Sequence, residues 1–249
     1  MADSSSDQVR FLECYQEWMI QQQEVLEELL QVYSQKPTEE QELTSVINKV
    51  VEHMQEYNNK RARLALVDAT SFFSPAWCTS IENSYLWLAG CRPSLAIRLV
   101  YSLCGSELEA QLSEYFEGVR KGNLGELSAD QLSLVSELQC RVIREEGRLS
   151  NKMAGLQEDI ADYPLTRLAN NSDDLGTESN GQVEQALDSH ANGLASVLVE
   201  SDKLRLSTLK ELLGIFTPLQ AVDYLIASKK LHLRMHQWGQ RRDQLHGRA

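Results

Sequence analysis

Apolar residues recur every three or four positions along nearly the whole 249-residue chain, and no stretch shows the period-two alternation that a half-buried strand requires. The clearest example runs from about residue 9 to residue 32, where one helical face is apolar and the opposite face carries Gln and Glu. The sequence therefore predicts an all-α fold, an antiparallel multi-helix bundle with long helices. The apolar face of this first helix consists of Phe11, Leu12, Tyr15, Trp18, Met19, Val25, Leu26, Leu29 and Leu30.

Capping residues predict where the next helices begin and end. A second helix is expected over about 38–67, because Thr38 and Gln41 have the spacing of a capping box. Ser74, followed by proline, predicts the start of a third helix, which Gly90 would end in a left-handed conformation.

The same signals continue into the middle of the chain. Pro93 predicts another helix start, with an end near residues 104–105. Ser106 and Ser128 each stand three residues before Glu or Gln, so each predicts a new helix. The second of these is long, about 45 Å if it continues to residue 160.

Residues 170–182 are polar and nearly free of large apolar side chains, which predicts a mobile surface loop. An interrupted helical region is expected over 183–213. Thr217 and Pro218 then open the last helix with a capping box.

Helices of this length bury their apolar faces only against partners of similar length, and such partners lie on both sides of the loop. We therefore expect one helical domain over residues 9–240. Residues 1–8 are expected to be disordered, and residues 241–249 to form a basic tail.

The net charge of −12 is unevenly distributed, because residues 229–249 carry about +5 and the preceding body about −17. An acidic body repels a phosphate backbone, so direct DNA binding is not expected, although the basic tail favours it. The five cysteines are widely separated, and neither a signal peptide nor a long apolar run occurs. These features predict no membrane contact and a location in the nucleus and cytoplasm.

Sequence patterns of enzymes are absent: there is no zincin or di-iron motif, Walker loop, Rossmann fingerprint or nucleophile elbow. Only one of the five histidines, His246, has a carboxylate three residues before it. An enzyme is therefore not expected.

His232 and His236 are the candidate ligands for a cofactor. They lie four residues apart, on the same face of the predicted last helix and at the boundary of its apolar stripe. Such a pair can chelate a transition metal, or one of them can be an axial ligand to haem. The alternative is a pair of boundary histidines that are bonded to carbonyls or water.

Around these histidines, Lys and Arg alternate with Leu, Met and Trp, so the segment is a basic amphipathic stretch of the kind that calmodulin or an anionic surface accepts. The alternative is a docked last helix with a solvated basic edge. We favour the docked helix, because Leu219 to Leu233 are needed for the core.

Four segments go beyond a generic helical pattern. They are residues 84–94 (Ser-Tyr-Leu-Trp-Leu-Ala-Gly-Cys-Arg-Pro-Ser), 101–105 (Tyr-Ser-Leu-Cys-Gly), 153–162 (Met-Ala-Gly-Leu-Gln-Glu-Asp-Ile-Ala-Asp) and 217–224 (Thr-Pro-Leu-Gln-Ala-Val-Asp-Tyr). In order and content they resemble the plant seed-dormancy control (Delay of Germination) family. The first also resembles the Trp-Leu-Gly-Gly-Phe-Arg-Pro type segment of TGA-type bZIP transcription factors.

The resemblance implies a non-enzymatic regulator of seed dormancy, germination and abscisic-acid signalling, linked to transcription, which binds protein phosphatases of that pathway or transcription regulators. It also implies haem binding, since the pattern around His232 and His236 resembles the C-terminal segment of the family. TGA factors bind DNA through a basic region and zipper before this domain, which we do not expect here because the helical pattern begins by about Val9. A homodimer is a further expectation to test.

Overall fold

The computed structural model describes residues 3–35, 40–110, 124–162, 166 and 177–248. Helices account for nearly all of these residues, and no strand occurs among them. The long helices are α1 (Asp3–Ser34), α2 (Glu40–Ala65), α5 (Ser94–Ala110), α7 (Ala129–Glu158), α9 (Thr177–Ile215) and α10 (Pro218–Leu245). The short ones are α3 (Thr70–Phe73), α4 (Ser80–Ser84) and the 3₁₀ turns η1 (Leu124–Glu126) and η2 (Asp159–Ala161).

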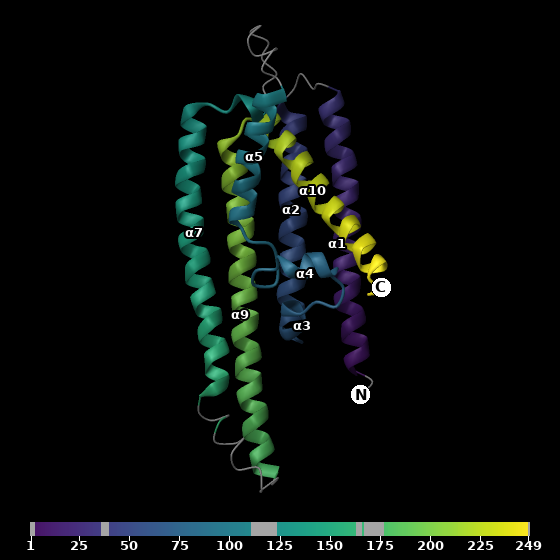
Figure 1. Cartoon of the computed structure of the whole chain (residues 1–249), viewed down its shortest axis with the longest axis vertical. Coiled ribbons are helices and arrows are strands. Elements are labelled where there is room, and N and C mark those ends of the chain that lie inside the picture. Colours follow the sequence, from purple (N-terminus) through teal and green to yellow (C-terminus); the bar gives the residue numbers. More distant parts are fainter. Residues whose placement is uncertain (1–2, 36–39, 111–123, 163–165, 167–176, 249) are drawn as a thin grey trace.

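The long helices lie side by side along one axis with antiparallel neighbours (Figure 1). Helix α9 packs between α7 and α2, α2 also packs on α1, and α10 crosses α1 obliquely. The short helices α3 and α4 lie beside the middle of the bundle (Figure 1), and α4 contacts α10. The predicted all-α antiparallel bundle is confirmed. Within the described ranges, no helix is both long and apolar enough to cross a lipid bilayer.

The main core forms where the apolar stripes of all the long helices meet. Each helix contributes at least one side chain that is almost completely removed from solvent. Burying such a side chain stabilises the fold by about 1.5–3 kcal/mol. Examples are Leu29 of α1, Val50 of α2, Ile97 of α5, Val135 of α7, Leu212 of α9 and Tyr224 of α10.

A smaller aromatic cluster closes the part of the bundle near the N-terminus. The Phe11 ring of α1 lies parallel to the Trp77 ring, with centroids 5.7 Å apart, and meets the Phe72 ring edge-on at 5.1 Å. Such pairs add about 0.5–1.5 kcal/mol to the burial of their surface. This cluster gives the Phe11 side chain, in the N-terminal half of α1, its buried environment.

Two of the predicted helix starts are confirmed with their side-chain bonds. Ser128 and Gln131 form a reciprocal capping box at the start of α7, and Thr217 and Gln220 form another at the start of α10, with Pro218 in the first turn. The predicted capping box at Thr38 lies outside the described residues.

The helix predicted between Ser74 and Gly90 is wrong. The chain turns after Ser74, and a short helix begins only after Thr79, which forms a capping box with Glu82. The left-handed residues are Leu88 and Ala89 (φ 46° and 63°), rather than the glycine that follows them. The reason is tertiary: buried arginines bind the carbonyl groups of this turn, as described below.

Four other boundaries differ from the prediction. Helix α1 begins at Asp3, so it includes residues that we expected to be disordered. Helix α5 continues through the expected stop at Gly105 and the expected start at Ser106 to Ala110. Helix α9 begins at Thr177 and has no interruption; the rest of the expected loop, 170–176, lies outside the described residues. Helix α10 extends through the first residues of the expected basic tail to Leu245.

Candidate functional site

Two arginines and one aspartate form an ionic network inside the bundle. Asp202 of α9 accepts a hydrogen bond from Arg61 Nε of α2 at 2.8 Å and another from Arg205 Nη1 at 2.7 Å. All three side chains are at most 8% exposed. Two buried cations need more acceptors than one carboxylate supplies, so the remaining N–H groups must find oxygen atoms elsewhere.

Those oxygen atoms come from the main chain of the turn between α4 and α5. Arg61 Nη2 donates to the carbonyl of Ala89 at 2.7 Å. Arg205 donates to three further carbonyls of the turn, and Ser201 bonds to one of these as well. Left-handed non-glycine residues cost about 1–3 kcal/mol each, and these bonds offset that cost. The carbonyls bound by Arg205 are those of Trp87 (2.5 Å), Leu88 (2.9 Å) and Cys91 (2.6 Å).

The following residues attach this turn to α7. Glu146, which is completely buried, accepts hydrogen bonds from Arg92 Nε at 2.7 Å and from the main-chain N–H of Ser94 at 2.6 Å. Trp87 Nε1 donates to Ser150 Oγ at 3.0 Å. The segment Trp87–Ser94 is therefore a structural junction between α2, α7 and α9.

A second polar junction joins α10 to α1 and α4, and it includes one of the predicted ligands. His236 Nδ1 lies 3.0 Å from Glu82 Oε2 and 3.2 Å from Tyr15 Oη, while Tyr15 Oη donates to Glu82 Oε1 at 2.9 Å. Burial alone would raise the pKa of Glu82, but hydrogen bonds from Thr79, His236 and Tyr15 lower it below its usual value. Glu82 is therefore a carboxylate that orients the His236 ring.

The same face of α10 is fixed by two further contacts. Asp243 Oδ2 accepts a hydrogen bond from the main-chain N–H of Ser80 at 2.9 Å, at the start of α4. Gly239 lies so close to Thr79 that a Cβ atom there would overlap Thr79 Oγ1. The C-terminal half of α10 is thus a docked helix, as we favoured, rather than a free basic tail.

His232, the other predicted ligand, lies one helical turn before His236 in a partly buried position. Burial, together with the nearby charge of Lys229, lowers the pKa of His232 to about 4, so its ring is neutral at physiological pH. Burial also lowers the pKa of Lys229 to about 8; its ammonium group donates to Gln22 and lies 5.3 Å from the Trp18 ring centroid.

A neutral imidazole is the form that can serve as an axial haem ligand. His232 has such a ring, because its lowered pKa keeps the imidazole neutral at physiological pH. Glu82 is bonded to Nδ1 of His236 and fixes the ring, while Nε2 of the same ring is hydrogen-bonded to Gln240 Nε2 at 2.9 Å. Within the described ranges, no group of three His, Cys, Asp or Glu side chains is placed to hold one metal ion.

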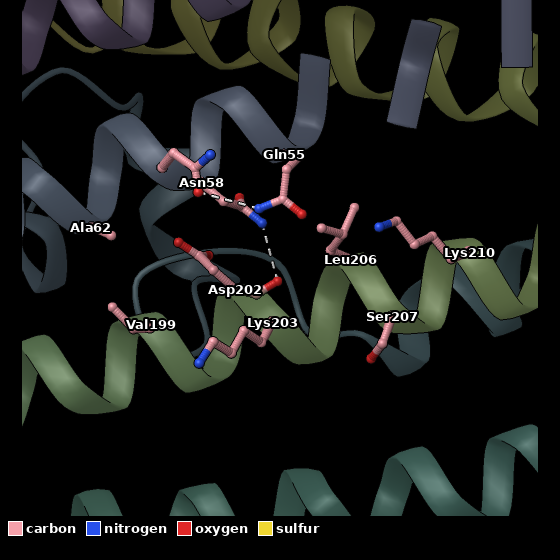
Figure 2. A pocket seen from close by; sticks show the side chains of 10 residues that line it. Gln55, Asn58, Ala62, Val199, Asp202, Lys203, Leu206, Ser207 and Lys210 are labelled. Atoms are coloured by element: carbon pink, nitrogen blue, oxygen red, sulfur yellow. Dashed lines mark hydrogen bonds between the residues drawn. The ribbon is translucent and has the colours of Figure 1, made fainter. Parts of the chain in front are cut away.

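A shallow groove between α2 and α9 lies beside the buried ionic network (Figure 2). Asn58 Nδ2 crosses it to the main-chain oxygen of Asp202 at 3.2 Å, and Gln55 Nε2 donates to Asn59 Oδ1 at 3.2 Å. The one lining carboxylate, that of Asp202, already accepts from two arginines. The groove therefore offers amides and lysines for contact, and no free acid or base for catalysis.

Sequence reasoning missed the residues that hold these junctions together. Glu82 had a local signal, since it stands three residues after Thr79 with capping-box spacing. Asp202 stands three residues before Arg205, but its other partner, Arg61, is 141 residues away, and nothing local marked Tyr15, whose partner Glu82 is 67 residues away. Both predicted histidines do lie at the boundary of the core, and only His236 belongs to a hydrogen-bonded cluster.

The fold and these junctions define the class of protein. It is a helical bundle in which buried ionic groups join the helices through hydrogen bonds and ion pairs. Comparison with known proteins identifies the family within this class. The family model described as seed dormancy control matches residues 25–102. The chain is 38% identical to Protein DOG1-like 3 of Arabidopsis thaliana, over 93% of this chain and 84% of the relative, and 38% identical to Protein DOG1-like 2, over 96% and 94%. The chain therefore belongs to the seed dormancy control family.

Lower similarity extends to two other kinds of plant protein. The chain is 26% identical to Protein RESPONSE TO ABA AND SALT 1 of Arabidopsis thaliana, over 90% of this chain and 93% of the relative. It is 25% identical to Transcription factor TGA5 of the same plant, over 89% of this chain but only 61% of the relative. The predicted relationship to both the dormancy proteins and the TGA factors is confirmed.

Proposed function

We propose that this protein is a non-enzymatic regulator of seed dormancy and abscisic-acid signalling that acts by binding other proteins in the nucleus and cytoplasm. Its partners would be protein phosphatases of the abscisic-acid pathway or regulators of transcription. The observation that carries this proposal is the similarity to DOG1-like proteins over nearly the full length of both chains. Similarity to a protein named for its response to ABA and salt supports the signalling context.

The arrangement of polar side chains supports binding rather than catalysis. Asp202, Glu146 and Glu82 are buried carboxylates, and each one accepts hydrogen bonds that join separate helices. Contact with calmodulin remains a prediction; because Val222, Leu225 and other apolar residues of α10 are buried in the core, calmodulin would have to bind its exposed edge.

The test is affinity capture from seed extract with the full-length protein, followed by identification of the captured proteins. A DOG1-like relative is run beside it as a positive control, and a fluorescent fusion reports localisation. We expect a signalling phosphatase or a transcription regulator in the captured set. Recovery of neither, in extract from which the relative captures one, would contradict the proposal.

We propose haem binding as a second function, supported by the neutral His232 ring and by the orientation of His236 by Glu82. Haem, when bound, would supply an iron centre that responds to redox state or to small gases. The role of this chain's residues would be to present one neutral imidazole as ligand and to hold a second one nearby.

Titration of the purified protein with haemin tests this second function through the Soret band. We expect a shifted band that His232→Ala/His236→Ala loses and that the exposed control His246→Ala keeps. A shift that persists in the double variant would exclude these two ligands.

A further inference from the structure

A groove runs along the outer side of the contact between α1 and α10. Its lining includes Leu26 of α1 and Leu233 of α10, which are buried or partly buried, together with Leu231 and Trp238. Leu231 is 46% exposed and Trp238 is 55% exposed. A half-exposed tryptophan beside an apolar groove is the kind of residue that supplies most of the energy at protein interfaces.

The charge of this groove is opposite to that of the molecule. Lys230 and Arg234 line it, and none of its lining residues is acidic, whereas the whole chain carries a net charge of −12. The other polar lining groups are the amides of Gln23 and Gln237. An apolar groove flanked by cations is complementary to a ligand that carries both apolar and acidic groups.

Contacts on the other side of α10 hold the groove in one shape. His236 bonds to Glu82, and Gly239 packs against Thr79, on the face of α10 turned towards α4. Trp238, which stands between these two residues in sequence, is thereby fixed on a docked helix instead of a free tail. A preorganised surface loses little side-chain and backbone freedom when a partner binds.

We propose that this groove is a docking site for an acidic amphipathic helix of a partner protein. The apolar face of that helix would cover Trp238 and Leu233, and its carboxylates would pair with Lys230 and Arg234. The proposal rests on the proposed function as a protein-binding regulator, and it adds the surface and the chemistry of the partner.

The geometry also orients the partner. The lining positions on α10 run from residue 230 to residue 238, which corresponds to about 12 Å of helix. A partner helix would therefore offer anchors over about two to three turns. On α1, Glu27 accepts from Gln23 at 2.8 Å and places a carboxylate beside the groove, so the acidic residues of the partner should lie over α10.

The test uses the purified full-length protein and a synthetic 18-residue peptide with Leu and Phe on one helical face and Glu on the flanks. A scrambled peptide of the same composition is the control ligand, and binding is followed by fluorescence anisotropy at two salt concentrations. We expect binding that weakens with salt and a clear preference for the amphipathic order.

Variants locate the binding surface. Trp238→Ala and Lys230→Glu/Arg234→Glu should each weaken binding at least about tenfold. The matched control Lys203→Glu/Lys210→Glu makes the same charge change on α9, at exposed residues, and should stay within about twofold of the wild type. Circular dichroism of each variant verifies that it is folded.

Four outcomes would overturn the docking site: equal affinity for the scrambled peptide, equal weakening by the α9 control, unchanged binding by the groove variants, or a dimer that only the groove variants lose. Binding of vesicles that contain phosphatidylserine, without binding of the peptide, would assign the groove to lipid instead. Capture from seed extract separates the two proposals. If the groove variants still capture the partner that the wild type captures, the docking site is wrong and the proposed function stands. If the wild type captures no partner, the proposed function is wrong, and the peptide assay still tests whether the groove is a docking site.

Discussion

The guanidinium of Arg205 lies directly against Gly90. A Cβ atom at Gly90 would be 2.7 Å from Arg205 Cζ, much closer than van der Waals contact allows. Since this arginine donates to three carbonyls of the same turn, it cannot move aside without giving up hydrogen bonds in a buried site.

Gly90→Ala should therefore destabilise the protein by about 2 kcal/mol or more, through overpacking and loss of these bonds. The measurement is the free energy of unfolding in urea. The control Gly147→Ala lies in α7 with no group near the added methyl, and should be neutral or stabilising by up to about 1 kcal/mol. Equal effects of the two variants would show that the contact with Arg205 is unimportant.

Gly239→Ala tests whether α10 is docked on α4. The added methyl would overlap Thr79 Oγ1, so α10 must move away from the capping box at Thr79 and Glu82. We expect a loss of about 1–3 kcal/mol and faster amide hydrogen exchange at the end of α10. Gly214→Ala in α9 adds a methyl to open space and is the matched control. Unchanged exchange in Gly239→Ala would mean that the docking is not tight.

Asp202→Ala should be among the most destabilising single changes in the protein, at about 3–5 kcal/mol, because it leaves Arg61 and Arg205 buried without their counter-ion. Glu211→Ala, which removes the exposed partner of Arg141, should cost less than about 1 kcal/mol. Thermal and chemical denaturation of both variants measure the difference, and similar costs would contradict a buried network.

Stability should fall as pH is lowered from about 6.5 to 4, and His232 should account for part of the loss. Its pKa in the folded protein is about 4, below the ordinary value of 6.5, so the unfolded chain binds more protons in this window. His232→Gln should flatten the profile there by on the order of 1–3 kcal/mol. His246→Gln, at an exposed position, should leave the profile unchanged. Chemical denaturation at several pH values gives the comparison, and a wild-type slope retained in His232→Gln would exclude this residue as the cause.

Local signals in the sequence predicted the fold class and several helix starts because those features depend on neighbouring residues. Apolar spacing shows which face of a helix is buried, and the capping boxes at Ser128 and Thr217 involve residues only three positions apart. These elements form as the sequence predicts.

The wrong prediction between Ser74 and Gly90 has a non-local cause. Ser-Pro is an acceptable helix start and glycine an acceptable helix stop, but Arg61 and Arg205 bind carbonyls at the end of this segment from positions 28 and 118 residues away in the chain. Free main-chain carbonyls are what those arginines require, and a continued helix would have used them internally. The hydrogen-bond partners of His236 could not be predicted from local sequence either, because Glu82 is 154 residues away in the chain.

The turn at Trp87–Cys91 is recognised almost entirely through its main-chain oxygen atoms, and it serves to unite distant helices. The most characteristic stretch of this sequence therefore maintains the shared fold. It does not determine which partner protein is bound. Relatives that keep the stretch intact are free to diverge in the proteins they recognise, and their differences should be sought on exposed helix faces.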